Sequence, residues 1–428
     1  IRRPPRSTQS RSSAASDVYK RQILSAYCAF STLTMAQPIS DSISLGIGYT
    51  NQSYYSLNSG ESANIDNSNW DIAFDASGYG SSIRINGAIG TELYKYPNGD
   101  TSSWSTFDTV GMSNWFPVYD SDTSWGMGAF NKGATSSPMD LGWGVYSTIT
   151  HHIIGDSLFM IKLTNGSYKK LQIVSLASGL FTFKYANLDG TNEINTSLAK
   201  ADYINRNFGY YNLRSDTSIY REPSSSSWDL LFTKYVAELF PGTFYGVTGV
   251  LQNADVEVIE MTDIANVNTF SAYAGHNFES AINTVGYDWK SFNMATFSYN
   301  ITDSLCYFID DRDGNIWRLV LTGFSGSSTG GINFTKELIS SINIHEEVTL
   351  NFGLYPNPAN DIAHVVFTNN ETTVIRILNL QGQTILEKHI SQDGFMDFPI
   401  DVTSYHAGMY LISLQQGSQV TVQRLIIQ

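Results

Sequence analysis

Short runs of alternating apolar and polar residues fill most of the chain, separated by turns rich in glycine and asparagine. Residues 156–163 and 169–176 form two such runs, with Asn165 and Gly166 between them. Asn-Gly between two alternating runs is the strongest short-range signal for a β-hairpin. Runs with the 3.6-residue period of an amphipathic helix are nearly absent. The pattern therefore predicts an all-β protein.

The central part of the chain contains two segments that match each other. Residues 54–74 and 210–232 both have a Tyr-Tyr pair, a polar loop and then a Trp-Asp pair that begins an apolar strand, and the hairpin turn at Gly166 recurs at Gly314. We expect the acidic residue of each Trp-Asp pair to order an adjacent loop. Self-similarity of this kind indicates repeated structural units. We therefore predict two tandem β units: residues 37–200 and residues 201–341.

Two segments at the start of the chain are left out of this fold prediction. Residues 1–22 are rich in Arg and Ser, and we interpret them as an adapter-derived artefact. Residues 23–36 form a short apolar run that ends in a small-residue cleavage site, and we interpret them as a truncated signal peptide. The run is too short to span a membrane, and no other run of about 20 apolar residues follows it. We expect an exported protein with no membrane span.

The charge balance argues against nucleic acid as a partner. The chain has 25 basic and 39 acidic residues, a formal net charge of −14, and this negative field repels phosphate backbones. Of the two cysteines, Cys28 lies in the predicted signal peptide and Cys306 in a strand-like run. We therefore expect no disulfide within the mature chain.

The C-terminal region has the pattern of a small β-sandwich, because several short strands follow one another between turns. After a polar linker at residues 342–350, two prolines flank Asn357 and prevent a helix. The region resembles the type A sorting domain of type IX secretion, through its Tyr-Pro-Asn-Pro opening, Asn-Leu-Gln-Gly-Gln turn and Gly-Met-Tyr-Leu strand. Tyr405 stands where that family usually has Leu. The residues of the sorting motif are Tyr355, Pro356, Asn357, Pro358, Gly382 and Gly408.

This resemblance implies a function in export. It implies an immunoglobulin-like β-sandwich at residues 351–428 and the type IX secretion translocon as a partner. The chain would then pass through the periplasm and the outer membrane and become a secreted or cell-surface protein. Release and attachment to the surface both stay open.

The two predicted units resemble a second family. The Trp-Asp-Ile-Ala-Phe segment at 70–74, Ser-Ser-Ile-Arg-Ile-Asn at 81–86, the segment 244–250 and the strand 313–324 are similar to the HmuY-type family of exported haem-binding proteins. The resemblance implies an all-β fold and capture of extracellular haem between two axial side chains, often histidines. It therefore implies a ligand-binding protein that is not an enzyme, with haem as the cofactor.

No ligand motif of that family maps onto particular positions of this chain. His151 and His152 are adjacent in a strand-like run, so we expect them to face opposite sides of a strand and only one to meet a pocket. His276 lies in a predicted loop. Haem iron also accepts Met or Tyr. The candidate haem ligands are His151, His152 and His276, with Met112, Met127 and Met160 as further axial candidates.

A second function class stays open beside haem binding. Tryptophans in predicted loops, such as Trp104, Trp115 and Trp125, can stack on sugar rings or contact a protein partner. The alternative is therefore a surface adhesion module that binds a glycan or a protein without haem. The sequence contains no G-x-S-x-G, H-E-x-x-H, paired C-x-x-C or phosphate-loop motif, and we expect no enzymatic activity.

Overall fold

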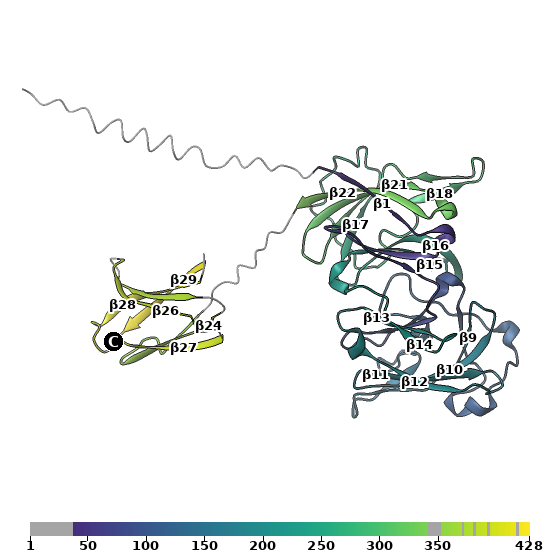
Figure 1. Ribbon diagram of the computed structural model, residues 1–428, viewed down its shortest axis with the longest axis horizontal. Helices are drawn as coiled ribbons and strands as arrows, with labels where there is room; N and C mark the ends of the chain where they lie inside the picture. The colour runs from purple at the N-terminus through teal and green to yellow at the C-terminus, as the bar shows by residue number, and fades with distance from the viewer. Residues whose placement is uncertain (1–36, 341–351, 370–371, 380–381, 392–393, 417–418) are drawn as a thin grey trace, which may run out of the picture. The chain divides into compact units, whose positions relative to one another are not determined.

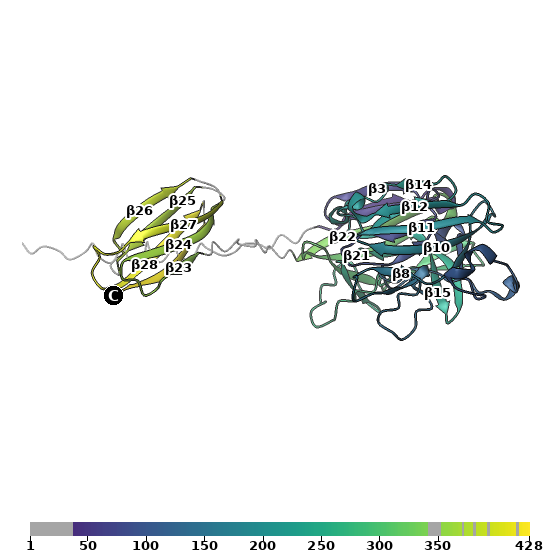
Figure 2. The ribbon, with the colours of Figure 1, turned by 90° about the horizontal axis from the view of Figure 1, so that it is seen from below.

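The computed structural model describes residues 37–340, 352–369, 372–379, 382–391, 394–416 and 419–428. The chain divides into two compact units, Ile1–Ser341 and Ile342–Gln428. Both consist of β-strands joined by loops and short 3-10 helices (Figures 1 and 2), which confirms the all-β prediction. The segments interpreted as an artefact, a signal peptide and a linker lie outside the described residues. Among the residues that are described, no helix is long and apolar enough to cross a membrane.

The first unit contains two large antiparallel sheets. The five-stranded sheet has the order β1 (Ile39–Ser44), β22 (Gly331–Ser340), β21 (Ile316–Phe324), β20 (Cys306–Asp310) and β17 (Glu257–Met261). In the seven-stranded sheet, five strands follow one another in the order β12 (Ile194–Ala199), β11 (Leu180–Asn187), β10 (Tyr168–Ala177), β9 (Phe159–Lys162) and β6 (Glu92–Lys95). The other two strands continue from β10 as well, first β8 (Ile153–Gly155) and then β7 (Gly144–Tyr146).

Two four-stranded sheets lie between these two large sheets (Figure 1). One has the order β16 (Thr243–Gln252), β15 (Leu230–Phe240), β2 (Asn51–Ser56) and β3 (Gly60–Asp66). The other has the order β5 (Ile83–Ile85), β4 (Ile72–Asp75), β13 (Phe208–Asn212) and β14 (Thr217–Ile219). A separate hairpin joins β18 (Lys290–Asn293) to β19 (Ser298–Ile301).

The alternating sequence pattern accounts for these strands. In β11, the buried side chains of Phe181, Phe183 and Tyr185 alternate with more exposed residues. Since successive side chains of a strand point to opposite faces, one face of β11 packs on the core and the other does not. The predicted turn at Gly166 joins β9 to β10, and its φ of 81° is readily adopted by glycine.

Strands from the start of the chain pair with strands from the second predicted unit. β2 pairs with β15, with Tyr55 opposite Leu230, and β1 pairs with the distant strand β22. Conversely, β13 of the second predicted unit pairs with β4 of the first, with Tyr211 opposite Ile72. Each strand that contains a Tyr-Tyr pair therefore lies beside the Trp-Asp strand of the other segment.

This exchange moves the division of the first unit away from the predicted boundary at residue 200. One hydrophobic core takes its residues from 72–213, and the other combines 43–57 with 230–334. We call β4–β14 the first half and β1–β3 with β15–β22 the second half. In Figure 1, the labelled strands β9–β14 lie in the lower part of this unit and β15–β22 in the upper part. Sequence similarity identifies the segments that are alike, but it does not identify the segment with which each one pairs.

The second unit is a β-sandwich, as the sequence predicts. One sheet contains β23 (Gly353–Tyr355), β24 (Ile362–Asn369) and β27 (Gly394–Asp401), and the other contains β26 (Thr384–Ile390), β25 (Thr373–Leu378), β28 (Gly408–Gln416) and β29 (Gln419–Ile427). Their inner faces share one core, to which Val365 and Ile400 of the first sheet and Ile377 and Ile412 of the second contribute.

Candidate functional site

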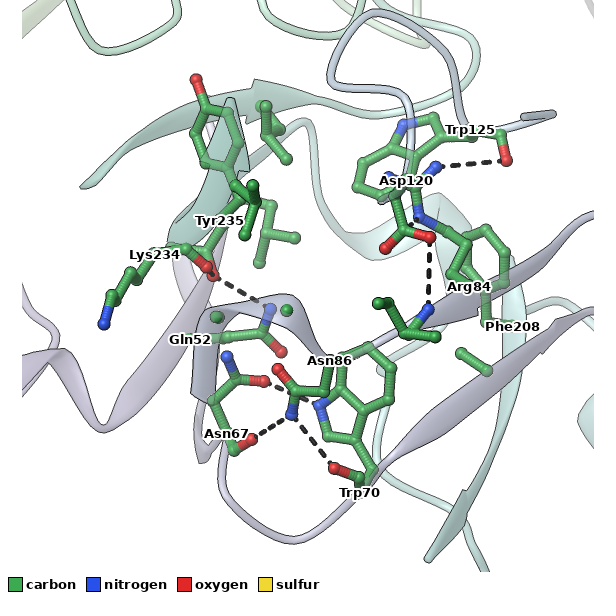
Figure 3. Close-up of a pocket in the computed structure, with 18 of the residues that line it drawn as sticks. Gln52, Asn67, Trp70, Arg84, Asn86, Asp120, Trp125, Phe208, Lys234 and Tyr235 are labelled. Carbon is green, nitrogen blue, oxygen red and sulfur yellow. Dashed lines mark hydrogen bonds and ion pairs between the residues drawn. The ribbon is translucent and has the colours of Figure 1, made fainter. Parts of the chain in front are cut away.

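A pocket lies between the two four-stranded sheets of the first unit, and residues of both halves line it (Figure 3). The cavity has a volume of about 80 Å³ and opens to solvent on one side. Trp70 and Phe208 belong to the first half, while Tyr54, Trp228 and Leu231 belong to the second. Both halves therefore contribute aromatic side chains to the walls.

Both tryptophans are held by tyrosines of the neighbouring exchanged strand. The rings of Trp70 and Tyr210 meet edge to face, with centroids 5.0 Å apart and an interplanar angle of 80°. Tyr54 and Trp228 do the same at 5.1 Å and 76°. Edge-to-face contacts of this kind add to the stabilisation from burial, so the strand exchange positions the two largest side chains of the pocket.

The aspartates that follow these tryptophans order adjacent loops, as the sequence predicts. Asp71 Oδ2 accepts a hydrogen bond from the backbone N–H of Leu213 at 2.8 Å. Asp229 Oδ2 accepts one from the backbone N–H of Leu57 at 2.7 Å. Asp71 also has an ion-pair partner, because Arg214 Nε lies 3.0 Å from its Oδ1, whereas none of the described residues forms an ion pair with Asp229. Burial raises the pKa of both carboxyl groups, and the pKa of Asp229 reaches about 6.

A loop at residues 119–128 covers one side of the pocket, and Arg84 holds it there. The guanidinium donates to the carbonyl oxygens of Ser124 at 2.9 Å and Ser121 at 2.8 Å. Trp125 Nε1 donates to the carbonyl oxygen of Gln252 at 2.9 Å and so connects the loop to the second half. Figure 3 shows Arg84 and Trp125 beside each other, with the guanidinium 5.0 Å from the centre of the indole ring.

Asp120 lies at the base of the same loop. Its Oδ1 accepts hydrogen bonds from the backbone N–H groups of Ala129 at 2.8 Å and Ile85 at 3.2 Å, and its Oδ2 lies 3.7 Å from Arg84 Nε. Burial raises the pKa of this carboxyl group, and Arg84 opposes the shift. The charged groups of Arg84 and Asp120 therefore interact with each other and with the backbone of the protein.

A buried carboxyl group also lines the pocket. Glu222 is 3% exposed, and it accepts hydrogen bonds from the Asn207 N–H at 2.9 Å, the Phe208 N–H at 3.2 Å and the Tyr210 hydroxyl at 2.9 Å. Burial raises its pKa to about 7. The neighbouring Arg221 donates to distant parts of the first unit, so this wall also connects separated segments of the chain.

In the first half, two asparagines satisfy most of the polar groups around Trp70. Asn86 Nδ2 donates to the carbonyl oxygens of Asn67 at 2.6 Å and Trp70 at 3.1 Å, and Trp70 Nε1 donates to Asn67 Oδ1 at 2.7 Å (Figure 3). Asn86 is 1% exposed, and its Oδ1 has no hydrogen-bond partner among the described residues. One buried acceptor in the lining of the pocket is therefore free.

In the second half, a similar arrangement leaves a donor free instead. Asn253 Nδ2 donates to the carbonyl oxygens of Ser225 and Trp228, both at 2.8 Å, so Ser225 stands where the first half has an asparagine. Its side chain is shorter, and Trp228 Nε1 has no partner within the part of the chain that the structure describes. Asn253 Oδ1, in contrast, accepts hydrogen bonds from Ala254 N and Asn207 Nδ2.

The histidines predicted as haem ligands do not line this pocket. His151 is exposed and lies in the turn between β7 and β8, with φ 56° and its Nδ1 2.8 Å from the Tyr146 hydroxyl. His152 is half-buried and precedes β8, so the expectation that both histidines lie on one strand is wrong. His276 is exposed in the loop between β17 and β18. Among the described residues, no group of three or more His, Cys, Asp and Glu side chains is placed to hold a metal ion.

The pocket does not fit a haem group. In another protein, a cavity of about 150 Å³ accommodates one benzene ring, whereas this cavity measures about 80 Å³ and a porphyrin is several times larger than benzene. Of the side chains that bind haem iron, the lining contains only tyrosines. The axial candidates Met112, Met127 and Met160 also lie outside the lining.

In the second unit, the predicted sorting motif forms one edge of the sandwich. Asn357 Nδ2 donates to the carbonyl oxygen of Arg424 at 2.6 Å, and Asn357 Oδ1 accepts from the backbone N–H of Ile426 at 2.9 Å. The Tyr355 ring stacks on His364, with centroids 5.3 Å apart. The peptide bonds that precede Pro356 and Pro358 are cis. Gly382 has a φ of 78°, and Gly408 is the first residue of β28.

Fold and site together define an all-β protein with a pocket between two of its sheets, and two segments of the chain match known families. Residues 48–185 match the family described as HmuY protein, and residues 353–428 match the secretion system C-terminal sorting domain. A search of curated proteins gives no match. The sorting-domain match shows that the chain is cargo of type IX secretion and is directed to the cell surface or secreted. The HmuY match ends before the second predicted unit.

Sequence reasoning missed the pocket as a site. It identified Trp70 and Trp228 as marks of a repeat and Trp125 as a loop aromatic, but it did not bring them together. The signal that was present is the pair of Trp-Asp segments, since both contribute their tryptophan to the same cavity. The histidine candidates lie instead in loops outside the pocket.

Proposed function

We propose that this protein is a non-enzymatic binding protein of the cell surface or the surrounding medium, and that its ligand occupies the pocket between the two four-stranded sheets. One observation carries the proposal. The lining combines aromatic side chains of both halves with a buried donor, Trp228 Nε1, and a buried acceptor, Asn86 Oδ1, that have no partner among the described residues. Buried polar groups without partners are costly, and a bound molecule would satisfy both.

The carboxyl groups of the pocket suit binding better than catalysis. Asp120 and Glu222 each accept two backbone N–H hydrogen bonds. These bonds fix loops and strands, whereas a general base must reach the proton of a substrate. The type IX export route supports a role outside the cell, where capture of a ligand is a common task for a protein of this class.

We also propose that both halves are HmuY-like. The family match covers residues 48–185, and the strand order β1-β22-β21-β20-β17 of the second half parallels the order β12-β11-β10-β9-β6 of the first. In each half, the aspartate of the Trp-Asp pair accepts a hydrogen bond from a leucine backbone N–H, Asp71 from Leu213 and Asp229 from Leu57. The pocket would then lie between two related structures rather than within one of them.

A ligand screen by thermal unfolding tests whether the pocket binds a ligand. Ala88 lines the pocket and is half-buried, so Ala88→Trp should obstruct it. Ala295→Trp is the matched control, because Ala295 is exposed on the β18–β19 hairpin. A pocket ligand present at 100 times its Kd should stabilise the wild type and the control by about 2.7 kcal/mol and should not stabilise Ala88→Trp. A ligand that stabilises all three proteins equally would contradict the proposal.

Haem capture is the second candidate function, and the HmuY match favours it because residues 48–185 include His151 and His152. The ligand would then contact exposed loops and not the pocket. Titration of the full chain with hemin, followed by absorbance, tests this candidate. A saturable Soret shift that is lost in a variant with His151, His152 and His276 changed to Ala would support it, provided that His389→Ala, which changes an exposed histidine of the sorting domain, keeps the shift. A flat titration would exclude haem.

A further inference from the structure

We infer that the pocket recognises an uncharged sugar residue, either a free monosaccharide or the terminal residue of a glycan. This inference rests on the proposed binding function and names the chemistry of its ligand. It follows from the charges, the free polar atoms and the shape of the lining, which are taken in turn.

The charged groups deep in the pocket are already neutralised by the protein. Arg84 is engaged by carbonyl oxygens and Asp120, and Glu222 is engaged by two N–H groups and a hydroxyl. Figure 3 shows the Lys234 ammonium directed away from the pocket. An anionic ligand would therefore lose its water without gaining a counter-charge, which is unfavourable in a buried site. An uncharged ligand has no such cost.

The rim of the pocket disfavours anions in particular. Asp122 lines the pocket and is half-buried, and it has no ion-pair partner within the described ranges. The first unit is part of a chain with a net charge of −14. Carboxylated sugars and phosphorylated ligands should consequently bind more weakly than their uncharged counterparts.

The free polar atoms require a ligand that both donates and accepts hydrogen bonds. Trp228 Nε1 offers only a donor and Asn86 Oδ1 offers only an acceptor. Neighbouring hydroxyl groups on one ring meet both requirements. A purely apolar ligand would leave these atoms unsatisfied and would bind poorly for that reason.

The shape of the lining suits a sugar ring that enters in part. The C–H faces of a sugar pack well on aromatic rings, and Trp70, Trp125 and Trp228 all contribute to the lining. The cavity of about 80 Å³ is too small for a whole six-membered ring, so only one edge of the ring would enter it, and the rest of the ring or the next residue of a glycan would lie in the part that is open to solvent.

Titration of the full chain, monitored by tryptophan fluorescence, tests the inference. The probes are glucose, galactose, mannose and xylose, with glucuronate, adenosine and uridine for comparison. Trp228→Phe keeps an aromatic ring but removes the donor. Trp289→Phe is the matched control, because Trp289 is 1% exposed and its Nε1 also lacks a partner in the described part of the chain, yet it does not line the pocket.

We expect at least one uncharged monosaccharide to bind, with a Kd that rises about 5- to 10-fold in Trp228→Phe, as the loss of one hydrogen bond implies, and less than about 2-fold in Trp289→Phe. Glucuronate should bind more weakly than glucose. If Trp228→Phe does not fold, Ser225→Asn provides the second variant, because it supplies an internal partner for Trp228 Nε1 and should weaken binding similarly.

The outcomes separate the two proposals. If a nucleoside or glucuronate binds with the predicted difference between the two tryptophan variants while no uncharged sugar does, the sugar inference is wrong and the binding pocket stands. If no probe binds, or if both variants change binding equally, the sugar inference fails. The screen with Ala88→Trp then decides whether the binding function fails with it.

Discussion

The two halves of the first unit surround Trp70 and Trp228 with the same backbone arrangement, but the polar side chains that complete it differ. In the first half, the indole N–H reaches Asn67 and the following aspartate has Arg214 as an ion-pair partner. In the second half, Ser225 is too short to accept from the indole, and Asp229 has no cation within 4.0 Å among the described residues. The two halves thus leave different polar atoms of the pocket lining without a partner among the described residues, Asn86 Oδ1 in the first half and Trp228 Nε1 in the second.

The largest expected effect tests the ion pair that only the first half has. Arg214→Ala removes the cation and leaves the fully buried Asp71 carboxylate with its backbone hydrogen bond alone. Breaking a buried pair in this way typically destabilises a protein by about 3–5 kcal/mol. The free energy of unfolding, measured with urea at pH 7, should fall by an amount in or somewhat below that range, since Arg214 is partly exposed.

The matched control for this change is Asn58→Ala, because Asn58 follows Leu57 as Arg214 follows Leu213 and is exposed. It should change the unfolding free energy by less than about 0.5 kcal/mol. Equal destabilisation by both variants would show that the contrast between the halves is not electrostatic.

The second prediction compares the two aspartates through the pH dependence of stability. Burial raises the pKa of Asp229 to about 6 from an ordinary value of 3.8. The folded state therefore binds this proton more tightly than the unfolded state does, so stability is fully present below pH 3.8 and is lost as the pH rises to about 6. Asp229→Asn keeps an acceptor for the Leu57 N–H and removes the ionisation.

Asp229→Asn should consequently be more stable than the wild type above pH 6, by at most about 3 kcal/mol, and the difference should shrink towards zero near pH 4. Thermal unfolding across this pH range measures it. Asp71→Asn is the informative counterpart, because Arg214 offsets part of the effect of burial on the pKa of Asp71, and this substitution should therefore stabilise the protein less than Asp229→Asn does. Equal stabilisation by both substitutions would contradict the distinction between the two aspartates.

The smallest effect exchanges the residues that distinguish the two tryptophans. Asn67→Ser should leave Trp70 Nε1 without its acceptor and destabilise the protein by about 1–2 kcal/mol. Ser225→Asn should give Trp228 Nε1 an acceptor and stabilise the ligand-free protein by about 1 kcal/mol. Urea unfolding of both variants measures the pair of changes, and a shift of the same sign in both would show that the indole hydrogen bond does not distinguish the halves.

The sequence predicts the local features of the fold well. The turn at Gly166, the apolar strands after Trp70 and Trp228, and the C-terminal sandwich with Asn357 near its beginning are each encoded by neighbouring residues. Hydrophobic alternation and turn residues act over a few positions, so they can be recognised without knowledge of the tertiary structure.

The long-range features could not be predicted in the same way. The pairing of β2 with β15 and of β13 with β4 depends on contacts between distant segments, and two similar segments offer two alternative pairings that sequence similarity does not rank. The pocket depends on this pairing, because Tyr54 of β2 and Tyr210 of β13, which both line it, belong to segments far apart in the sequence. His151 was placed in a strand for a related reason, since the apolar residues of β8 follow it directly although the strand begins only at Ile153.

The antiparallel pairing of β1 with β22 has a consequence for the order of folding. It places Ile39 opposite Lys336, so the first strand of the unit finds its neighbour only when nearly the whole unit has been made. Contacts between such distant residues must overcome a large loop-closure entropy and slow folding. Until then, β1 stays without its partner, and the second hydrophobic core, which includes Ile43 of β1 and Phe334 of β22, cannot close. The last step in the assembly of the first unit therefore joins the two ends of that unit.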